Sequence, residues 1–391
     1  MKLEILKFDH FGRGIAKNNN KVIFIDKALP GEYIDTLITS EKKNYCEGKI
    51  VKVINKSNKR IESICPYYND CGGCNFLHMD YSLEKEYKIN KACELLNRCD
   101  GFYETNNLNY RNKVILHVKD NKIGLYKEKT NEIIEIDYCY LLNNRINKVI
   151  KDLKMIDLKK YKISKIIIKS NQDKILMNVD NIVDNDFINV FSYVDTIISN
   201  NKVIKGKGFI EEIIDNKVFK ITSYAFFQVN RDGLLNINKI IKEYLKNKKI
   251  LKVLDLYSGT STWGILISDY AKKVISVESN KESCDNAREN ILRNNIKNID
   301  IINSKVEDCI DRFSNIDLVI IDPPRSGLDT KTVEYLKKIH SKYIIYISCD
   351  MLTLKRDLNL LNENYIVEEI KLVDMFKRTY HCESITILER K

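Results

Sequence analysis

The sequence has no long apolar run and no leader-like amino terminus. Apolar runs such as residues 318–321 and 343–347 are far shorter than the roughly 20 residues that span a bilayer. Residues 1–8 alternate polar and apolar side chains, which is typical of a strand and not of a signal peptide. We therefore expect a cytoplasmic protein without a membrane partner, in which cysteine thiols stay reduced.

Acidic residues are in deficit, because 65 Lys and Arg face 54 Asp and Glu, which leaves a net charge of +11. This excess favours a polyanionic partner such as RNA, although a solvated basic surface has the same composition. Hydrophobic residues make up 44% and charged residues 30% of the chain, which excludes a disordered protein. A chain of 391 residues is too long for a single core, so two or three domains are expected.

Residues 1–58 alternate short strand patterns with turn signals, including Pro and Gly at 30–31. The expected strands include Lys2–Phe8, Lys21–Ile25, Tyr33–Ile38 and Cys46–Ile54. Short strands at this density predict a small β-barrel of the oligonucleotide-binding type. We expect this barrel, its lysine-rich last strand and the Tyr110–Lys113 segment to contact RNA, because Lys and Arg bind phosphates and Tyr can stack on unpaired bases.

Residues 59–222 are expected to form a β-rich central domain. The segment begins with cysteines and a helix pattern at Ser82–Asn97. Strand patterns then follow at Lys113–Val118, Lys122–Tyr126, Ile163–Lys169 and Ile175–Val179. No repeat or low-complexity linker interrupts them.

Residues 223–391 alternate strand and helix patterns, such as a helix at Lys281–Asn294. The expected strands are Leu251–Leu256, Val274–Val277, Ile299–Ile302, Leu318–Ile321 and Tyr343–Ile347. This alternation builds a parallel, doubly wound sheet, so the fold class is α/β with a Rossmann-like domain.

The loop after the first of these strands lacks the G-x-G-x-x-G fingerprint that cradles a dinucleotide pyrophosphate. Residues 255–264 read DLYSGTSTWG instead, and Glu278 ends the second strand. Acids at these two strand ends, Asp255 and Glu278, suit the ribose hydroxyls of a nucleoside. Asp322 ends the fourth strand before two prolines, which cannot continue the ladder and hold its carboxylate over the same edge. The pattern favours S-adenosylmethionine over NAD or FAD.

Eleven cysteines are present, and three of them form a compact set at Cys65, Cys71 and Cys74. Gly72 and Gly73 let the backbone fold around a metal there. Thiolates bind both a structural zinc and an iron–sulfur cluster, and the spacing does not separate the two.

Ordered motifs along nearly the whole chain resemble a known family. They are Gly12–Ala16, Val22–Phe24, Ala28–Glu32, NYRNK at 109–113, SYAFFQVN at 223–230, DPPR at 322–325, Ser348-Cys349 and His381-x-Glu383. Together with the cysteine spacing they resemble the RNA uracil-5-methyltransferase family, and its bacterial 23S rRNA branch most closely. The first part of the chain is similar to the TRAM domain of that family.

The resemblance implies a role for each candidate residue. Cys349 would be the nucleophile and Glu383 the base of a covalent methyl transfer. Those that would contact S-adenosylmethionine are Gln228, Tyr257, Glu278 and Asp322. Those that would hold a 4Fe–4S cluster, with zinc as the alternative, are Cys65, Cys71, Cys74 and Cys139. Ser261 stands where many members have glycine, and we expect it to take room near the methionine moiety.

Uracil chemistry gives an independent reason for a cysteine. Carbon 5 is a poor nucleophile until a thiolate adds to carbon 6 and turns the ring into an enolate. A base must then remove the carbon 5 proton so that the thiol can leave. The target base must also swing out of any stack to reach such a site.

Several alternatives stay open. A tRNA uridine-5-methyltransferase would use the same mechanism, although 23S rRNA is the expected partner and a monomer the expected state. An amino-group methyltransferase would need an aromatic residue after the two prolines, where this chain has Arg325. An inactive RNA-binding relative would have no use for Cys349 with Glu383. Cys382 flanks the expected base and has no assigned role.

Overall fold

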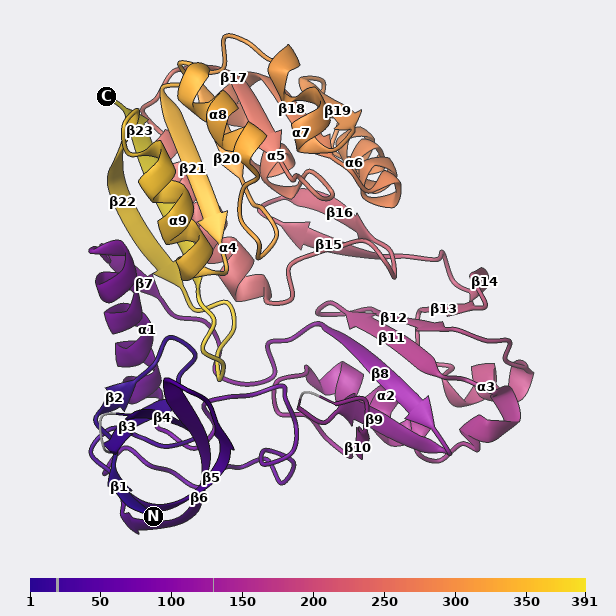
Figure 1. Cartoon of the computed structure of the whole chain (residues 1–391). Coiled ribbons are helices and arrows are strands. Elements are labelled where there is room, and N and C mark those ends of the chain that lie inside the picture. The colour runs from indigo at the N-terminus through magenta and orange to yellow at the C-terminus, as the bar shows by residue number, and fades with distance from the viewer. Residues whose placement is uncertain (19–20, 129) are drawn as a thin grey trace.

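The structure is a computed structural model that describes residues 1–18, 21–128 and 130–391. Its first part is a small barrel, at the lower left of Figure 1. In spatial order the strands are β1 (Lys2–Glu4), β5 (Tyr33–Glu41), β6 (Tyr45–Asn55), β4 (Lys21–Asp26), β3 (Gly14–Asn18) and β2 (Lys7–Phe8). Inward side chains such as Ile23, Ile25 and Ile34 fill its interior. The expected barrel is confirmed.

The expected single strand Lys2–Phe8 is divided in the structure, so this detail of the prediction was wrong. β1 pairs with β5, whereas β2 pairs with β3. Between them the Ile5 N–H donates to the Glu32 carbonyl and the Leu6 N–H to the Ile15 carbonyl. The chain changes its pairing partner at this point, and this change helps to curve the sheet into a barrel.

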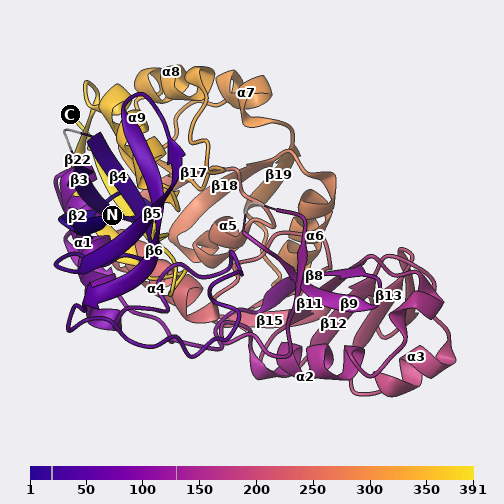
Figure 2. The same cartoon turned by 60° about the horizontal axis from the view of Figure 1, so that its bottom comes forward.

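Helix α1 (Tyr81–Leu96) links the barrel to the C-terminal part of the chain. Tyr87, in the first half of the helix, packs with Phe76 of the preceding loop and with Leu29 of the barrel region. Leu95, near its end, packs with Leu372 of the C-terminal sheet. The barrel and the C-terminal sheet therefore share one connecting helix. Figure 2 shows the barrel at the left of the molecule and the central sheet at the lower right.

The central sheet has seven strands. Their spatial order is β10 (Ile133–Glu135), β9 (Lys122–Tyr126), β8 (Lys113–Lys119), β11 (Lys165–Ser170), β12 (Ile175–Val179), β13 (Thr196–Ser199) and β14 (Lys202–Lys205). Two helices that the sequence pattern did not predict, α2 (Asn144–Leu153) and α3 (Asn185–Val190), pack apolar side chains against this sheet. The expected β-rich character holds, but the region is mixed α and β.

The C-terminal sheet has eight strands. Their order is β19 (Ile299–Asn303), β18 (Ala271–Glu278), β17 (Ile250–Leu256), β20 (Leu318–Ile321), β21 (Tyr343–Ser348), β23 (Glu383–Arg390), β22 (Tyr365–Val373) and β7 (Gly101–Tyr103). The first five are parallel, and β23 runs antiparallel between β21 and β22. The order switches at β17, which pairs with β18 on one side and β20 on the other.

Helices cover both faces of this sheet, which confirms the Rossmann-like fold. They are α4 (Arg231–Leu245), α5 (Thr262–Leu266), α6 (Lys281–Arg293), α7 (Val306–Cys309), α8 (Thr330–Lys338) and α9 (Met351–Leu361). Two apolar clusters result, one with Ile237 of α4 and the other with Leu354 of α9. Short 3₁₀ helices lie at Leu158–Tyr161, Ser268–Tyr270 and Ile310–Arg312. None of the helices in the described ranges has the length and apolar character to cross a membrane.

Two elements connect the central and C-terminal parts. The hairpin of β15 (Ile210–Ile214) and β16 (Lys217–Ile221) packs against α6. Strand β7, although it lies within residues 59–222, adds to the C-terminal sheet beside β22. The division of the chain at residues 58 and 222 therefore stays a prediction.

Candidate active site

A cavity of about 770 Å³ opens at the carboxyl edge of the C-terminal sheet. The loops after β17, β18, β20 and β21 line it, together with the segments before α4 and β23. All six predicted cofactor and catalytic residues line this one cavity: Gln228, Tyr257, Glu278, Asp322, Cys349 and Glu383. Residues far apart in the sequence meet where the strand order switches, which is the usual ligand position in such sheets.

The loop after β17 folds back tightly on its own strand end. Tyr257 and Ser261 have positive φ angles of 59° and 55°, which residues with a Cβ adopt in few places. Gly264 is required by packing, since a Cβ there would lie 2.6 Å from the Ser261 Oγ and 3.0 Å from the Asp255 Oδ2. The tight fold brings Tyr257 and the backbone around Gly259 to the cavity wall.

Ser261 does not take room from the cavity. Its side chain is fully buried, and its Oγ lies 2.8 Å from the Oγ of Ser276 on β18. The hydroxyl points into the sheet because the left-handed backbone turns it away from the loop surface. The expectation that this serine crowds the methionine moiety was wrong.

Asp255 and Glu278 end neighbouring strands but occupy different positions. Asp255 is fully buried, and its Oδ2 accepts hydrogen bonds from the Gly264 N–H and the Ser276 hydroxyl, both at 3.1 Å. Burial raises the pKa of this carboxyl to about 7. Glu278 lines the cavity and accepts the Gly259 N–H at 2.9 Å. Asp255 therefore fixes the loop, and the prediction that it faces a ribose was wrong.

Asp322 is held by a tryptophan that the sequence pattern did not single out. The Trp263 indole N–H donates to the Asp322 Oδ2 at 2.9 Å. Burial raises the pKa of Asp322 to about 6, and the indole hydrogen bond opposes that rise. Because the two prolines at 323 and 324 follow directly, the carboxyl is fixed at the strand end beside the cavity.

The register of β21 and β23 brings Cys349 and Glu383 together. Ser348 lies opposite Ser384 in this antiparallel pair, and the Ser384 hydroxyl donates to the Ser348 carbonyl at 3.0 Å. Cys349 directly follows β21 and Glu383 begins β23, so the two lie one position beyond this pair, where facing residues point to the same side of the sheet. The thiol and the carboxyl therefore meet at the cavity.

The surroundings of Cys349 keep its thiol protonated in the free protein. Burial raises the pKa of the thiol to about 11, and the carboxyl of Glu383 adds to that rise. The Arg325 side chain hydrogen-bonds the thiol and opposes the rise, because a cation stabilises a thiolate. Arg325 is thus the cation available to the sulfur.

Glu383 also binds its proton tightly. Burial and the nearby carboxyl of Asp322 raise the pKa of Glu383 well above its ordinary range, and Arg325 opposes the rise. Two acids in one desolvated cavity cannot both ionise easily. A bound cation between them would favour the carboxylate form of both.

The segment that carries Gln228 is tied to the central sheet. The buried Lys169 of β11 donates from its Nζ to the carbonyls of Thr222 and Ala225, at 2.7 and 2.6 Å. The Asn112 side chain donates to the Gln228 carbonyl at 3.0 Å. These bonds from the central sheet hold the irregular segment between β16 and α4 so that Gln228 lies at the cavity, which strand-end motifs do not predict.

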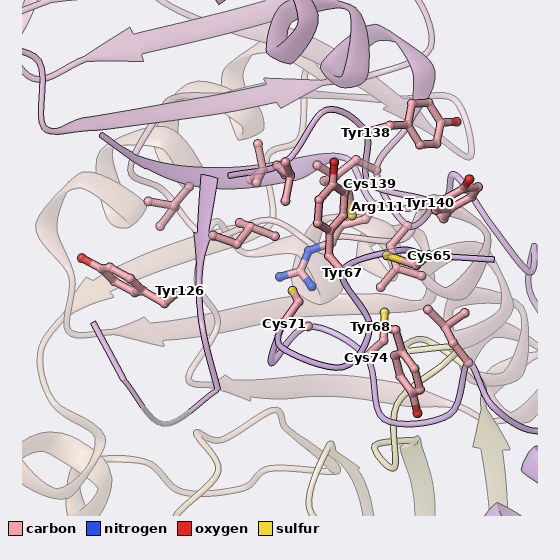
Figure 3. Close-up of a pocket in the computed structure, with 18 of the residues that line it drawn as sticks. Cys65, Tyr67, Tyr68, Cys71, Cys74, Arg111, Tyr126, Tyr138, Cys139 and Tyr140 are labelled. Atoms are coloured by element: carbon pink, nitrogen blue, oxygen red, sulfur yellow. The ribbon is translucent and has the colours of Figure 1, made fainter. Parts of the chain in front are cut away.

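The four predicted metal ligands, Cys65, Cys71, Cys74 and Cys139, line a second cavity of about 380 Å³ in the central part. Figure 3 shows their sulfur atoms on different sides of one space, with the guanidinium of Arg111 beside them. Burial raises the pKa of Cys65, Cys71 and Cys74, with the neighbouring sulfurs adding to the rise.

The chemistry of this donor set fits a metal cluster, because thiolates are the ligands of iron–sulfur centres. Within the described ranges, no three His, Cys, Asp or Glu side chains form a group that would hold one metal ion.

The sequence patterns assigned no role at the first cavity to Trp263, Arg325 and Phe376. Trp263 and Arg325 act through their polar groups on Asp322 and Cys349. Phe376 lines the cavity from the segment between β22 and β23. The single tryptophan of the chain, next to a glycine loop, was the best available hint. The RNA contact expected for Tyr110–Lys113 stays a prediction. In the structure the Tyr110 hydroxyl donates to the Lys377 carbonyl.

Comparison with known proteins identifies the chain. The tRNA (uracil-5-)-methyltransferase family model matches residues 194–391, and a TRAM domain model matches residues 1–51. An uncharacterised RNA methyltransferase of Caldanaerobacter subterraneus subsp. tengcongensis is 32% identical, with 100% of this chain and 98% of that protein covered. An uncharacterised RNA methyltransferase of Aquifex aeolicus is 29% identical, over 100% and 99%.

A solved structure shares the fold. The tRNA (uracil-54, C5)-methyltransferase of Pyrococcus abyssi, in complex with S-adenosyl-L-homocysteine, has a TM-score of 0.83 and 24% identity. It covers 99% of this chain and 100% of its own. The cavity at the sheet edge, the amino-terminal barrel and these matches agree, and the chain belongs to the RNA uracil-5-methyltransferase family, as an S-adenosylmethionine-dependent RNA methyltransferase with a TRAM domain.

Proposed function

We propose that the protein methylates carbon 5 of a uridine in 23S rRNA through a covalent adduct between Cys349 and carbon 6. The observation that carries this proposal is the pairing of Cys349 with Glu383 in the cavity that Gln228, Tyr257 and Asp322 also line. A thiol and a carboxyl at one strand-pair end supply the two groups that a carbon 5 methylation needs.

The reaction begins at the thiol. Cys349 loses its proton to solvent, and its sulfur forms a bond to carbon 6 while the electrons of the 5,6 double bond move onto the carbon 4 carbonyl as an enolate. Carbon 5 then takes the methyl group from the sulfonium, whose carbon–sulfur bond breaks and whose sulfur becomes neutral. The Glu383 carboxylate removes the carbon 5 proton, the double bond re-forms, and the Cys349 thiolate leaves.

The charges around the cavity support this order of steps. In the free protein both Cys349 and Glu383 hold their protons, because burial raises the pKa of each. A bound sulfonium cation favours the carboxylate of Glu383 and of Asp322. Arg325 stabilises the thiolate of Cys349, first when it forms and again when it leaves. When the methyl donor is bound, the carboxylate of Glu383 and the thiolate of Cys349, which are the reactive forms, are therefore both favoured.

Four residues would hold the methyl donor. Glu278 lies at the end of β18, where an acid binds ribose hydroxyls. Tyr257 lines the same wall, and Gln228 and Asp322 lie in the same cavity as the reactive pair. The rigid backbone at each of these positions suits a ligand that must be held in one orientation.

We also propose that Cys65, Cys71, Cys74 and Cys139 hold a 4Fe–4S cluster, with zinc as the alternative. Their sulfurs line a space of about 380 Å³, whereas four thiolates around one zinc ion converge to about 2.3 Å from a single point. The cluster would supply structural order to the loops 65–74 and 136–142 and take no part in methyl transfer. Arg111 would balance part of its negative charge.

The choice of 23S rRNA rests on the resemblance of the ordered motifs to the ribosomal branch. A tRNA is the alternative substrate, since the similar Pyrococcus abyssi enzyme is named for uracil 54 of tRNA. Mapping 5-methyluridine in 23S rRNA and in tRNA, from cells with and without this gene, decides between them. Loss of the modification from tRNA alone would contradict the ribosomal assignment.

Trapping with 5-fluorouridine RNA tests the covalent chemistry. Fluorine at carbon 5 cannot leave as a proton, so wild-type protein with methyl donor should form a protein–RNA complex that survives denaturing electrophoresis. Cys349→Ala should form no complex and show no turnover, whereas Cys382→Ala should trap normally. If Cys349→Ala still trapped RNA, the nucleophile would be another residue.

A further inference from the structure

A series of ring contacts, bridged at one point by an arginine, leads from the barrel to the catalytic cavity. We call it the ring series, and its members are Tyr45, Phe24, Arg13, Phe11, Tyr380, His381 and Phe376. Ring centroids lie 5.7 Å apart for Tyr45–Phe24 and for Phe11–Tyr380, 4.2 Å for Tyr380–His381 and 6.2 Å for His381–Phe376. The Arg13 guanidinium joins the two halves, 4.4 Å from the Phe24 centroid and 5.7 Å from that of Phe11.

The series crosses three separate parts of the chain. Tyr45 and Phe24 lie on β6 and β4, and Phe11 lies in the turn between β2 and β3. Tyr380 and His381 lie in the segment between β22 and β23, which reaches toward the barrel in Figure 1. The last member, Phe376, lines the catalytic cavity itself.

Packing between the parts does not explain the whole series. Phe11 is 48% exposed and Tyr45 is 36% exposed, so large apolar rings face solvent at the barrel end. Tyr380 is only partly buried at the edge of the cluster that joins the barrel to α1. A contact that served only to glue the parts together would bury these rings.

Arg13 serves as a flat platform more than as a free cation. Its guanidinium donates to the Asp9 carboxylate at 2.7 Å and to the Glu47 carboxylate at 3.3 Å. These bonds neutralise its charge and fix its plane over Phe24. Free cations lie nearby instead, at the exposed Lys42 and Lys43 in the turn before Tyr45.

We propose that the ring series is a stacking track for the single-stranded nucleotides that flank the target uridine. The inference rests on the proposed function, since a uridine swung out into the cavity leaves its neighbours unstacked. Aromatic faces and a guanidinium plane stack any base, and lysines beside them pair with the phosphates. The track begins at the cavity wall, so the bound strand runs from the reaction site along the barrel.

Single substitutions in the full-length protein test the track. Phe11→Ala and Tyr45→Ala remove the two exposed rings, and Tyr33→Ala, 38% exposed on the same barrel, is the matched control outside the series. The probe is a fluorescent oligouridylate of about 12 nucleotides, which fits the site size of one such barrel. Each ring variant should weaken binding by about 5- to 50-fold, because stacking contributes that much per base, and Tyr33→Ala should bind within twofold of wild type, roughly.

A second probe separates stacking from charge and from misfolding. An abasic strand of the same length has phosphates but no bases, so the ring variants and the wild type should bind it equally. Equal losses on both probes, or no loss on oligouridylate in folded variants, would overturn the proposal. These binding measurements need no turnover. A failure to trap 5-fluorouridine RNA would refute the proposed function, and the binding results would still show whether the ring series stacks on bases.

Discussion

The methyl-transfer cavity and the cysteine cavity are built in different ways. The first lies at the ends of β17, β18, β20, β21 and β23, so regular backbone hydrogen bonds fix the position of every reactive group. The second takes three of its cysteines from residues 65–74, where the structure has no helix or strand, and the fourth from the loop before α2. Strand ends position the reactive residues of the first cavity, whereas loops position the cysteines of the second.

The difference also appears in the polar contacts. Around the first cavity the carboxyls of Asp255 and Asp322 have fixed donors in Gly264, Ser276 and Trp263. In the second cavity, burial and the neighbouring sulfurs instead raise the pKa values of Cys65, Cys71 and Cys74, a penalty that metal ligation would relieve. We therefore expect the first cavity to survive without its ligand and the second to require one.

Among substitutions that keep the Cys349 nucleophile, Glu383→Gln has the largest expected effect on turnover. A glutamine cannot accept the carbon 5 proton, so turnover should fall roughly 100- to 10 000-fold while the Cys349 adduct accumulates even on unmodified RNA. Methyl transfer from labelled donor and denaturing gels measure the two effects. Glu389→Gln, on the same strand but away from the cavity, is the control. Turnover within tenfold of wild type would assign the base elsewhere.

Cys74→Ser tests whether the second cavity depends on its ligand. We expect loss of iron and sulfide, and unfolding of the central part at a temperature lower by roughly 5 °C or more, since bound metal contributes folding free energy. Donor binding at the other cavity should change less than about twofold, because no described residue lines both cavities. Iron analysis, thermal melts and calorimetry measure these quantities, with Cys93→Ser, an exposed cysteine on α1, as the control.

If the same Cys74→Ser protein lost donor binding as well, the two cavities would be coupled and the comparison would fail. If the purified wild type held zinc in place of iron, the ligand would be different. The dependence of the loops on a ligand would still stand.

The contrast between the cavities explains what the sequence could predict. Strand-end motifs placed Glu278, Asp322 and Cys349 correctly at one edge, because parallel strands in a doubly wound sheet all end there. The same rule failed for Asp255, since it does not tell which strand-end acid faces the ligand and which supports the loop. Helix α2 was missed although Ile146, Val149, Ile150 and Leu153 follow helical spacing, whereas α3, with 6 residues, is too short to show a clear period.

Contacts between distant segments were beyond the sequence pattern. Lys169 from β11 and Arg325 after β20 reach the catalytic region only through tertiary packing. The pairing of β7 with β22 joins residues about 270 positions apart, and no local periodicity encodes it. To predict such contacts one must know how the strands of whole sheets pair, and a single sequence does not show this.

Asp322→Asn tests whether the carboxylate of Asp322 contributes to the binding of S-adenosylmethionine in the first cavity. Removing the charge should weaken S-adenosylmethionine binding roughly 10- to 100-fold, the usual effect of losing a hydrogen bond to a charged group. In the wild type, affinity should fall as the pH drops through about 6, where Asp322 takes up its proton. Calorimetric titration across this pH range measures both effects. An unchanged affinity in Asp322→Asn would remove this residue from the donor site.

The same substitution should not weaken the fold. The folded pKa of Asp322 is raised, so protonation favours the folded state, and that stabilisation is present below the unfolded pKa and lost as the pH rises through about 6. At about pH 8 the wild type carries a half-buried carboxylate whose charge desolvation disfavours, and Asp322→Asn should melt at an equal or higher temperature. A lower melting temperature would show that the carboxyl stabilises the edge of the sheet.

Trp263→Phe has the smallest expected effect, and it separates the position of Asp322 from its charge. Phenylalanine keeps the apolar volume but removes the indole N–H that donates to the Asp322 carboxylate. Since that hydrogen bond favours the charged form, its loss should raise the pKa of Asp322 further and shift the acid limb of donor binding to higher pH by roughly half to one unit. Affinity at about pH 8, where the carboxylate forms in either protein, should change only a few-fold. An equal loss at every pH would mean that Trp263 shapes the cavity wall, whereas a shift confined to the acid limb assigns it the ionisation of Asp322.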